Sequence, residues 1–431
     1  MQRNRSQSRY VSFLATLFSL VLLLATGCST PQTSSVKAFD GGRLIVGNGS
    51  EPMENAVFLV ENGQIIAVGQ SGELDVPEGA SRVDLTGKTV MPAIIDTHKH
   101  LAGTREALID QLEHLAYYGV GVAVSLGQDV GDATFQVREE TLPNAAQIRT
   151  AGRGITMPEP GRSEAPYWVT NEEEARTAVQ EQAERKVDLV KIWVDDRNGM
   201  YEKLSPALYG TIIDEAHQYN LRVTAHIFAL EDAKGLLRAG IDAFAHGIRD
   251  RDADDEVVEL FRERPNVFLV PNLPDPGVVA DMSWLAESIP ADELQQMQTA
   301  ATDRPAVQKT FGIQARNLAK LNAAGVRIAF GTDGSTPWAP HAEMADMVSA
   351  GMTPAEVIVA ATAHSADLLQ LTDTGTVETG KNADFIVLAA NPLDDITNTR
   401  QIAAVYLRGI KVDRDALRAR WMDAASQSSG K

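Results

Sequence analysis

Apolar and amphipathic segments alternate through the middle of the chain. Short runs rich in β-branched residues predict strands, and each is followed by a segment with helical periodicity. The predicted strands are residues 93–98, 120–126, 146–152, 189–194, 222–226, 243–246, 267–270 and 328–332. Asn171, Ser205 and Thr353 stand at predicted helix starts, the last in a capping box with Glu356. Eight strand–helix units predict an α/β protein with one closed (β/α)8 TIM-like barrel over residues 92–374.

Both flanks of the predicted barrel are rich in β-strand signals. Residues 36–91 contain short strands with turns, among them a hairpin signal at Asn62-Gly63, and residues 375–431 contain two more apolar segments. We expect these two segments to pair in space. The prediction is a small β-sandwich formed jointly by the N- and C-terminal segments.

The N-terminal residues have the pattern of a bacterial export signal. Three arginines within the first nine residues precede an apolar run at 11–26, which ends in small residues before Cys28, the only cysteine. This pattern resembles a lipobox and predicts a signal peptide over 1–27, lipidation of Cys28 and a polar tether over 28–35. An uncleaved transmembrane anchor is the alternative, although the run is short for a full span. Ser29 after the cysteine favours a lipoprotein of the outer membrane that faces the periplasm.

The formal net charge of the chain is −19 at pH 7. Nucleic-acid binding needs clustered Lys and Arg, so this charge disfavours nucleic acid as a partner and fits solubility. The expected partners are therefore a small-molecule substrate and, through the lipid anchor, a membrane. The sequence leaves open whether the chain forms a homo-oligomer.

Polar side chains stand at the carboxyl ends of five predicted strands. His98 and His100 are two residues apart, so both can leave a strand on the same side. Because strand ends converge on one face of a barrel, these side chains are expected to surround one spot. The full set is His98, His100, Lys191, His226, His246 and Asp333.

Imidazole and carboxylate groups suit zinc and similar metals. A buried lysine can lose its proton, and a neutral amine can add CO2 to give a carbamate that bridges two metals. Each residue considered alone also has an ordinary structural role. Lys191 alone would be an ion-pair partner, and Asp333 alone would be a turn residue. His226 alone is as well explained by a hydrogen bond in the core as by metal binding. The six residues together predict two divalent metal ions, with zinc favoured, and a CO2-derived carbamate on Lys191.

These motifs resemble the amidohydrolase superfamily, in the branch of imidazolonepropionase-like enzymes and metal-dependent prolidase-type dipeptidases. The resemblance covers residues 36–415. It departs from the family pattern at Ala93, where glycine is usual, and on the second strand, which lacks the Arg and Asp often found there. The matching motifs are VMPAIIDTHKH at 90–100, VKI at 190–192, TAH at 224–226, FAHG at 244–247 and FGTD at 330–333.

The resemblance implies a role for each residue. His98, His100 and Asp333 would bind the more buried metal, and the histidines of strands five and six would bind the second. Carboxylated Lys191 and a hydroxide would bridge the two metals. The hydroxide would attack the scissile carbonyl, and Asp333 would carry the proton of the attacking water to the leaving group.

Long segments after the strands are expected to select the substrate. Residues 154–169 hold Trp168, and residues 272–310, which contain Trp284, are long enough to form a lid. The aromatic rings fit either an apolar substrate or packing of the lid itself.

Three residues are candidate substrate contacts. Tyr201 lies in the segment after the fourth strand, and Trp338 and His341 follow the eighth strand. His341 fits a substrate contact and a structural role equally well.

The predicted function is metal-dependent hydrolysis of an amide (C–N) bond, in a dipeptide or an N-acyl amino acid. The same centre would also serve a lactonase, an esterase or a cyclic-amide hydrolase. A non-catalytic periplasmic metal-binding protein is the alternative from another class. The intact set of six residues argues against it.

Overall fold

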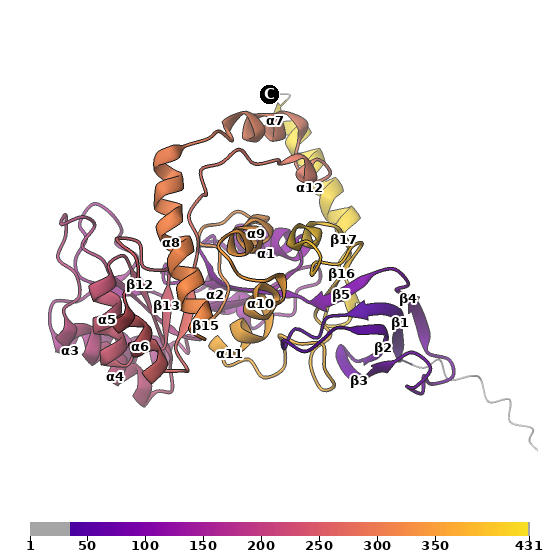
Figure 1. Cartoon of the computed structure of the whole chain (residues 1–431), viewed down its shortest axis with the longest axis horizontal. Coiled ribbons are helices and arrows are strands. Elements are labelled where there is room, and N and C mark those ends of the chain that lie inside the picture. The colour runs from indigo at the N-terminus through magenta and orange to yellow at the C-terminus, as the bar shows by residue number, and fades with distance from the viewer. Residues whose placement is uncertain (1–34, 430–431) are drawn as a thin grey trace, which may run out of the picture. The chain divides into compact units, whose positions relative to one another are not determined.

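The computed structural model describes residues 35–429 of the chain (Figure 1). The predicted signal peptide and the lipidation site Cys28 lie outside the described residues. Within the described part, no helix is both long and apolar enough to cross a membrane.

Parallel strands form two sheets in the centre of the fold. One has the order β6-β7-β8, and the other has the order β10-β9-β11-β12-β13-β14-β15. All eight predicted strands are present within a few residues of their predicted bounds, and β9 and β10 are additional to the prediction. The strands are β6 (Ile94–Lys99), β7 (Val120–Ser125), β8 (Gln147–Thr150), β9 (Ile155–Thr156), β10 (Tyr167–Trp168), β11 (Val190–Val194), β12 (Val223–Ile227), β13 (Ala243–Ala245), β14 (Phe268–Val270) and β15 (Arg327–Ile328).

Helices follow the strands and cover them. The three predicted helix starts are confirmed, because Asn171, Ser205 and Thr353 each accept a backbone N–H at an N-terminus, and Thr353 forms the capping box with Glu356. The helices are α1 (Arg105–Tyr117), α2 (Ala133–Arg138), α3 (Glu172–Glu184), α4 (Pro206–Gln218), α5 (Leu230–Ala239), α6 (Asp255–Glu263), α7 (Ala291–Ala300), α8 (Pro305–Ala323), α9 (Ala339–Ser349), α10 (Pro354–Val359), α11 (Ser365–Leu368) and α12 (Arg414–Ser429), with short helices η1 (Ser283–Leu285), η2 (Ala360–His364) and η3 (Ile396–Arg400).

Backbone hydrogen bonds connect both edges of the three-stranded sheet to the larger one. At one edge, the N–H of Thr97 in β6 donates to the carbonyl of Phe330, which follows β15, at 2.9 Å. At the other edge, the N–H of Asp188, just before β11, donates to the carbonyl of Thr150 in β8 at 2.8 Å. The strands nevertheless form two separate sheets, so a fully closed barrel is not confirmed.

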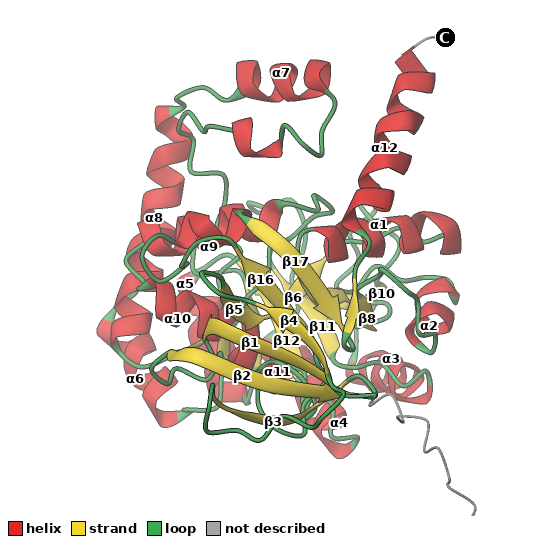
Figure 2. Cartoon of the chain, turned by 90° about the vertical axis from the view of Figure 1, so that its right-hand side faces the viewer, coloured by secondary structure: helices red, strands yellow, loops and turns green. Residues whose placement is uncertain are grey.

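The two ends of the chain build one further sheet, in the foreground of Figure 2. Its order is β18-β17-β16-β5-β1-β2-β3, with β4 paired to β1. The predicted pairing of the N- and C-terminal segments is seen between β16 and β5, whereas the two-layered sandwich is not confirmed. These strands are β1 (Lys37–Leu44), β2 (Met53–Glu61), β3 (Gln64–Gln70), β4 (Ser81–Asp84), β5 (Thr89–Pro92), β16 (Phe385–Leu388), β17 (Ile402–Leu407) and β18 (Ile410–Lys411).

Aromatic packing holds this sheet together across its two sequence segments. Phe39 stacks on Phe58 with ring centroids 4.9 Å apart, and Phe385 meets Phe39 edge-on at 5.0 Å. Such pairs contribute beyond the burial of their area. The Asn62-Gly63 hairpin is confirmed between β2 and β3, with positive φ at both residues.

Residues 273–304, here named the arch, stand out from the strands between β14 and α8. The arch carries η1 and α7, and it rises over α9 in Figure 1. None of the α7 side chains is buried, so this helix is not part of the main core. The arch lies within residues 272–310, the segment predicted as a lid, whose last residues belong to α8.

Candidate metal centre

The ends of β6 and of the eighth strand bring three of the predicted ligands together. Nε2 of His100 lies 3.0 Å from Oδ1 of Asp333, and Nε2 of His98 lies 3.6 Å from the same oxygen. Nε2 of His246, after β13, lies 3.7 Å from Oδ2 of Asp333. His98, His246 and Asp333 offer ligand atoms that all lie within 4.8 Å of one another, which is the spacing of groups that could hold one metal ion.

Two of these residues have an uncommon backbone conformation. His246 has φ of 81° and Asp333 has φ of 55°. Non-glycine residues with positive φ are strained and persist where surrounding structure holds them. The backbone N–H of Asp333 donates to the carbonyl of His98 at 2.8 Å, which fixes one of the two.

His226 at the end of β12 completes the row of histidine rings. Its centroid lies 4.6 Å from that of His246. Its Nε2 lies 3.0 Å from Oδ2 of Asp195 and also 3.0 Å from guanidinium nitrogens of Arg197 and Arg249. Because a carboxylate accepts and a guanidinium donates, these contacts hold the ring in place without assigning its proton to one nitrogen. Carboxylates that orient a ligand histidine are common in metal sites.

Lys191 lies on β11 with a fully buried side chain. Its Nζ has no hydrogen-bond partner among the residues that the structure describes. Burial lowers the pKa of Lys191 to about 7, so a large share of this amine is uncharged near neutral pH. A buried amine that is partly neutral and has no hydrogen-bond partner is suited to add CO2 and then to bind metal.

Two glycines make room for this lysine and its neighbour. A Cβ on Gly127 would lie 2.9 Å from Cγ of Lys191 and 2.7 Å from the Trp193 ring, and one on Gly154 would lie 2.1 Å from that ring. Gly127 also has φ of +95°, which side chains rarely adopt. The loops after β7 and β8 therefore approach β11 only because these positions are glycine.

Burial sets the charge state of the imidazoles. It holds the pKa of His98, His226 and His246 well below the usual histidine value, so these rings are neutral and able to bind metal. Burial alone would raise the pKa of Asp333, but its hydrogen bond with His100 keeps that pKa below its usual value. The donor set is thus neutral imidazoles and an anion, which fits zinc or a similar dication.

Asn272, two residues after β14, was not among the predicted site residues. Its Oδ1 lies 2.9 Å from Nδ1 of His98 and accepts the backbone N–H of His246 at 3.2 Å. The proton of His98 is therefore held on Nδ1, and Nε2 faces Asp333. The signal available in the sequence was a polar residue shortly after the predicted seventh strand.

A small polar pocket of about 100 Å³ lies at the predicted ligands. It is lined by the four histidines and Asp333 together with Gln128, Glu159, Arg162 and Trp193. Glu159 is buried and pairs with Arg162 at 2.6 Å and with Arg197 at 3.1 Å. The walls opposite the predicted ligands are thus polar and charged.

The predicted substrate contacts differ in where they lie. Trp338 is half-buried and lines a cavity of about 900 Å³ that also reaches Asp333. The hydroxyl of Tyr201 donates to the carbonyl of Pro160 at 3.2 Å, and Tyr201 does not line the polar pocket. Trp168 belongs to β10 and lines a separate cavity against α3.

His341 does not face the pocket. Its side chain is fully buried in α9, with Nδ1 3.0 Å from the hydroxyl of Thr399 and Nε2 2.9 Å from the carbonyl of Tyr118. Because protein groups occupy both nitrogens, the structure favours the structural role, one of the two that the sequence left open for His341.

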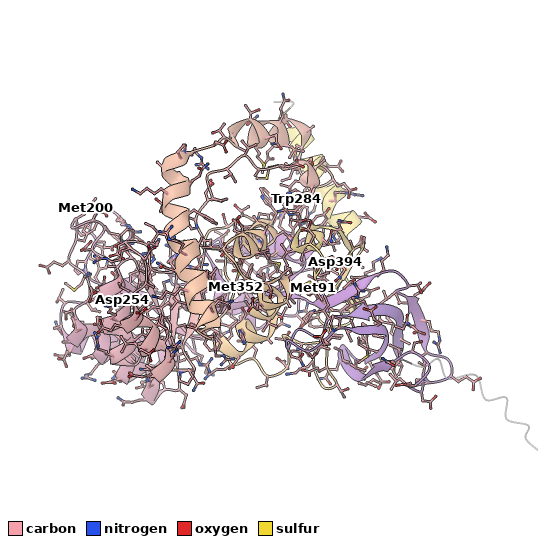
Figure 3. The ribbon with its side chains drawn as sticks, in the orientation of Figure 1. Met91, Met200, Asp254, Trp284, Met352 and Asp394 are labelled. Atoms are coloured by element: carbon pink, nitrogen blue, oxygen red, sulfur yellow. The ribbon has the colours of Figure 1, made fainter. Side chains whose placement is uncertain are left out.

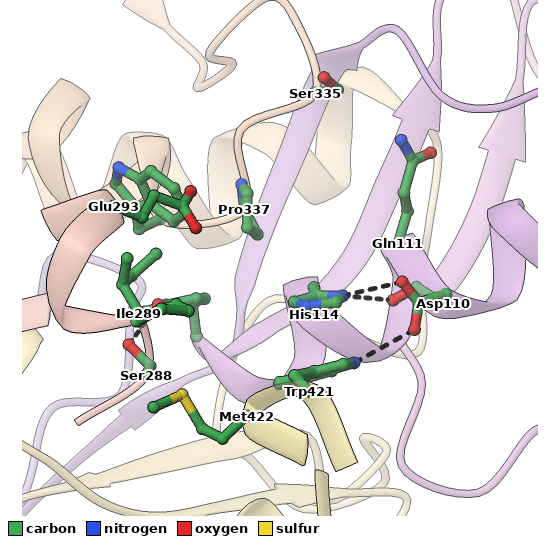
Figure 4. A pocket seen from close by; sticks show the side chains of 13 residues that line it. Asp110, Gln111, His114, Ser288, Ile289, Glu293, Ser335, Pro337, Trp421 and Met422 are labelled. Carbon is green, nitrogen blue, oxygen red and sulfur yellow. Dashed lines mark hydrogen bonds and ion pairs between the residues drawn. The ribbon is translucent and has the colours of Figure 1, made fainter. Parts of the chain in front are cut away.

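A further cavity of about 360 Å³ lies between α1, the arch and α12 (Figure 4). There the ring of Trp421 stacks on His114 at 3.5 Å, and its Nε1 donates to Asp110 at 3.1 Å. None of the six predicted ligands lines this cavity. It is distinct from the candidate centre.

Comparisons with known proteins point to one family. The profile of the amidohydrolase family matches residues 89–412. Ochratoxinase of Aspergillus niger is 27% identical in an alignment 447 positions long, which covers 88% of this chain and 86% of the relative. Imidazolonepropionase of Deinococcus radiodurans is 27% identical in an alignment 434 positions long, which covers 92% of this chain and 99% of the relative. The crystal structure of a putative prolidase from Bifidobacterium longum superposes with a TM-score of 0.73 at 29% identity, covering 90% and 98% of the two chains.

These similarities extend over both the strands and the candidate centre. They show a TIM-barrel-type α/β fold and a hydrolase that acts on carbon–nitrogen bonds. Divalent metal ions are typical of such enzymes, and the clustered His98, His246 and Asp333 fit them. The chain belongs to the amidohydrolase family.

Proposed function

We propose that this protein hydrolyses the amide bond of a dipeptide or an N-acyl amino acid at a centre of two divalent metal ions, with zinc favoured. The observation that carries the proposal is the convergence of neutral histidines, a buried unpartnered lysine and one carboxylate at the strand ends. Ochratoxinase, imidazolonepropionase and prolidase among the similar proteins support action on amide bonds.

Each residue has a proposed role at the centre. His98, His100 and Asp333 would hold one ion, His226 and His246 would hold the other, and Lys191 as a carbamate would bridge them. When bound, the two ions would lower the pKa of a water molecule and polarise the scissile carbonyl.

Asp333 is the proposed proton carrier. Its carboxylate is anionic and 41% exposed, so it can reach a substrate while it contacts His100. It would accept the proton that the attacking water loses and donate it to the nitrogen of the leaving amine. The C–N bond then breaks, and a carboxylic acid and a free amine result.

A hydrolysis screen of the metal-loaded enzyme tests this proposal. Dipeptides and N-acyl amino acids should be cleaved faster than lactones, cyclic amides and aryl esters of similar size. Lys191→Ala should reduce turnover by at least ~10³-fold and lower the bound metal, with partial rescue by short carboxylic acids. Full activity of Lys191→Ala would contradict the bridging role, and preferred cleavage of lactones or esters would contradict the amide substrate.

We also propose that the protein is an outer-membrane lipoprotein that faces the periplasm. This rests on the sequence pattern that ends in Cys28, and on a predicted tether that precedes β1. Cys28→Ser should release the protein from the membrane fraction or block its maturation. Unchanged membrane attachment would favour an uncleaved anchor instead.

A further inference from the structure

Two cavities of opposite character meet at Asp333. The polar pocket of about 100 Å³ is lined by the histidines, and Asp333 also lines a second cavity of about 900 Å³. We call this second space the arch cavity. Its walls come from the arch, from the segment after β15, from α9 and from η3.

The arch cavity is lined mainly by apolar side chains. They include Val278, Met282, Trp284, Met297, Trp338 and Ala342. Val278 is 46% exposed, and neighbouring Val279 on the arch is 59% exposed. Apolar surface of this extent beside a reactive group marks a place for an apolar ligand rather than for water.

One wall of the arch cavity is held in place by aromatic and cationic contacts. The Trp284 ring lies 5.9 Å from the His341 ring and 4.8 Å from the guanidinium of Arg400. In Figure 3, Trp284 lies on the inner side of the arch. A tryptophan fixed from two sides offers a preformed flat surface to a planar group.

The polar pocket, in contrast to the arch cavity, favours a charged group of the ligand. Arg162 lines it, and Arg197 and Arg249 both contact His226 at 3.0 Å. Nη2 of Arg197 and Nε of Arg249 are buried and have no hydrogen-bond partner among the described residues. Arg162 is 45% exposed, so its guanidinium can receive a carboxylate at the pocket.

These observations orient the substrate. In an N-acyl amino acid, the free carboxylate lies on the amine side of the scissile bond and the acyl group lies on the other. We infer that the carboxylate points toward Arg162 at the polar pocket and that the arch cavity binds a bulky apolar or aromatic acyl group. This inference rests on the proposed function and narrows its substrate to amino acids that carry a large acyl group.

Turnover of matched substrates tests the inference. N-acetyl-, N-benzoyl- and N-(2-naphthoyl)-L-alanine share one leaving amine. For the metal-loaded wild type, kcat/KM should rise at least ~30-fold from the acetyl to the naphthoyl compound. Equal or falling kcat/KM along this series would overturn the inference.

A variant on α9 ties the preference to the arch cavity. Ala342 is exposed and lines the cavity, so Ala342→Trp fills it without disturbing the core. The loss in kcat/KM should be at least ~20-fold larger for the naphthoyl than for the acetyl compound. Ser349→Trp is the matched control, because Ser349 is exposed on the same helix and lines none of the cavities described above, and it should behave as wild type. Equal losses for both substrates in Ala342→Trp would contradict the assignment.

A binding measurement separates this inference from the proposed function. Calorimetry with 2-naphthoate should show one saturable site in the wild type and in Ser349→Trp, and at least ~10-fold weaker binding in Ala342→Trp. If no acyl alanine is cleaved but this binding pattern holds, amide hydrolysis of N-acyl amino acids fails and the arch cavity remains an acyl-binding site. If 2-naphthoate does not bind the wild type, or binds Ala342→Trp equally well, the cavity assignment is wrong.

Discussion

At the scale of single residues, the chemistry of the centre depends on partners that hold the proposed ligands. Asn272 keeps the proton of His98 on Nδ1, and Asp195 contacts Nε2 of His226. Such partners orient a ligand ring, and their loss commonly weakens metal binding.

Replacing Asn272 tests this positioning role. Asn272→Leu removes the acceptor for His98 and should weaken metal affinity ~10–100-fold, as measured by competition with a chromogenic chelator. Asn272→Asp keeps an acceptor oxygen and should recover most of the affinity. Wild-type affinity in the leucine variant would show that His98 is oriented without Asn272.

His341 makes a prediction about acid stability. Burial lowers its pKa to about 4, so the folded protein keeps it neutral while the unfolded chain takes up a proton near pH 6.5. Its contribution to stability is therefore complete above pH 6.5 and is lost as the pH falls toward 4. In His341→Gln, which cannot take up that proton, the melting temperature should fall less over this range, by roughly 2–5 °C. Parallel pH profiles of wild type and variant would contradict this.

Residue identity allowed the six proposed ligands to be predicted, but not the orientation of side chains. Two histidines on one strand and polar groups at strand ends are visible in the sequence because strand periodicity fixes their direction. For His341 the sequence left two roles open, because the side of α9 it faces depends on Thr399 and Tyr118, which are distant in the chain. For Trp168 it left substrate contact and packing open, and the residue lies on β10.

At the scale of elements, loops must pass close to β11 for the centre to form. Gly127 lies in the loop after β7, where any side chain would overlap Lys191 and Trp193. Strand patterns predicted the eight parallel strands, since apolar β-branched runs are a strong local signal. The close approach of two loops at glycines is a tertiary feature, which a sequence pattern does not show.

A substitution in this loop tests the close approach. Gly127→Ala should push Lys191 out of position, lower the melting temperature by several degrees and reduce bound metal by more than about half. Gly131→Ala is the matched control, since a Cβ there would meet nothing within 4 Å. Equal metal content in both variants would show that the loop has room to move.

At the scale of the whole molecule, the sheet at the chain ends and the parallel strands together position the candidate metal centre. β5 pairs with β16 in the end sheet and is followed directly by β6, which carries His98 and is followed by His100. The joining of the two chain ends was predictable from their β patterns. The arch was predictable only as a long connection, because its path over α9 depends on packing of Trp284 and not on a local periodicity.

We propose that residues from five strands hold two metal ions in this hydrolase. Mass-spectrometric metal analysis of the full chain, purified after growth with zinc or manganese, counts those ions. Close to two equivalents of a divalent metal per chain are expected. Less than about half an equivalent of any transition metal would rule out the two-metal centre.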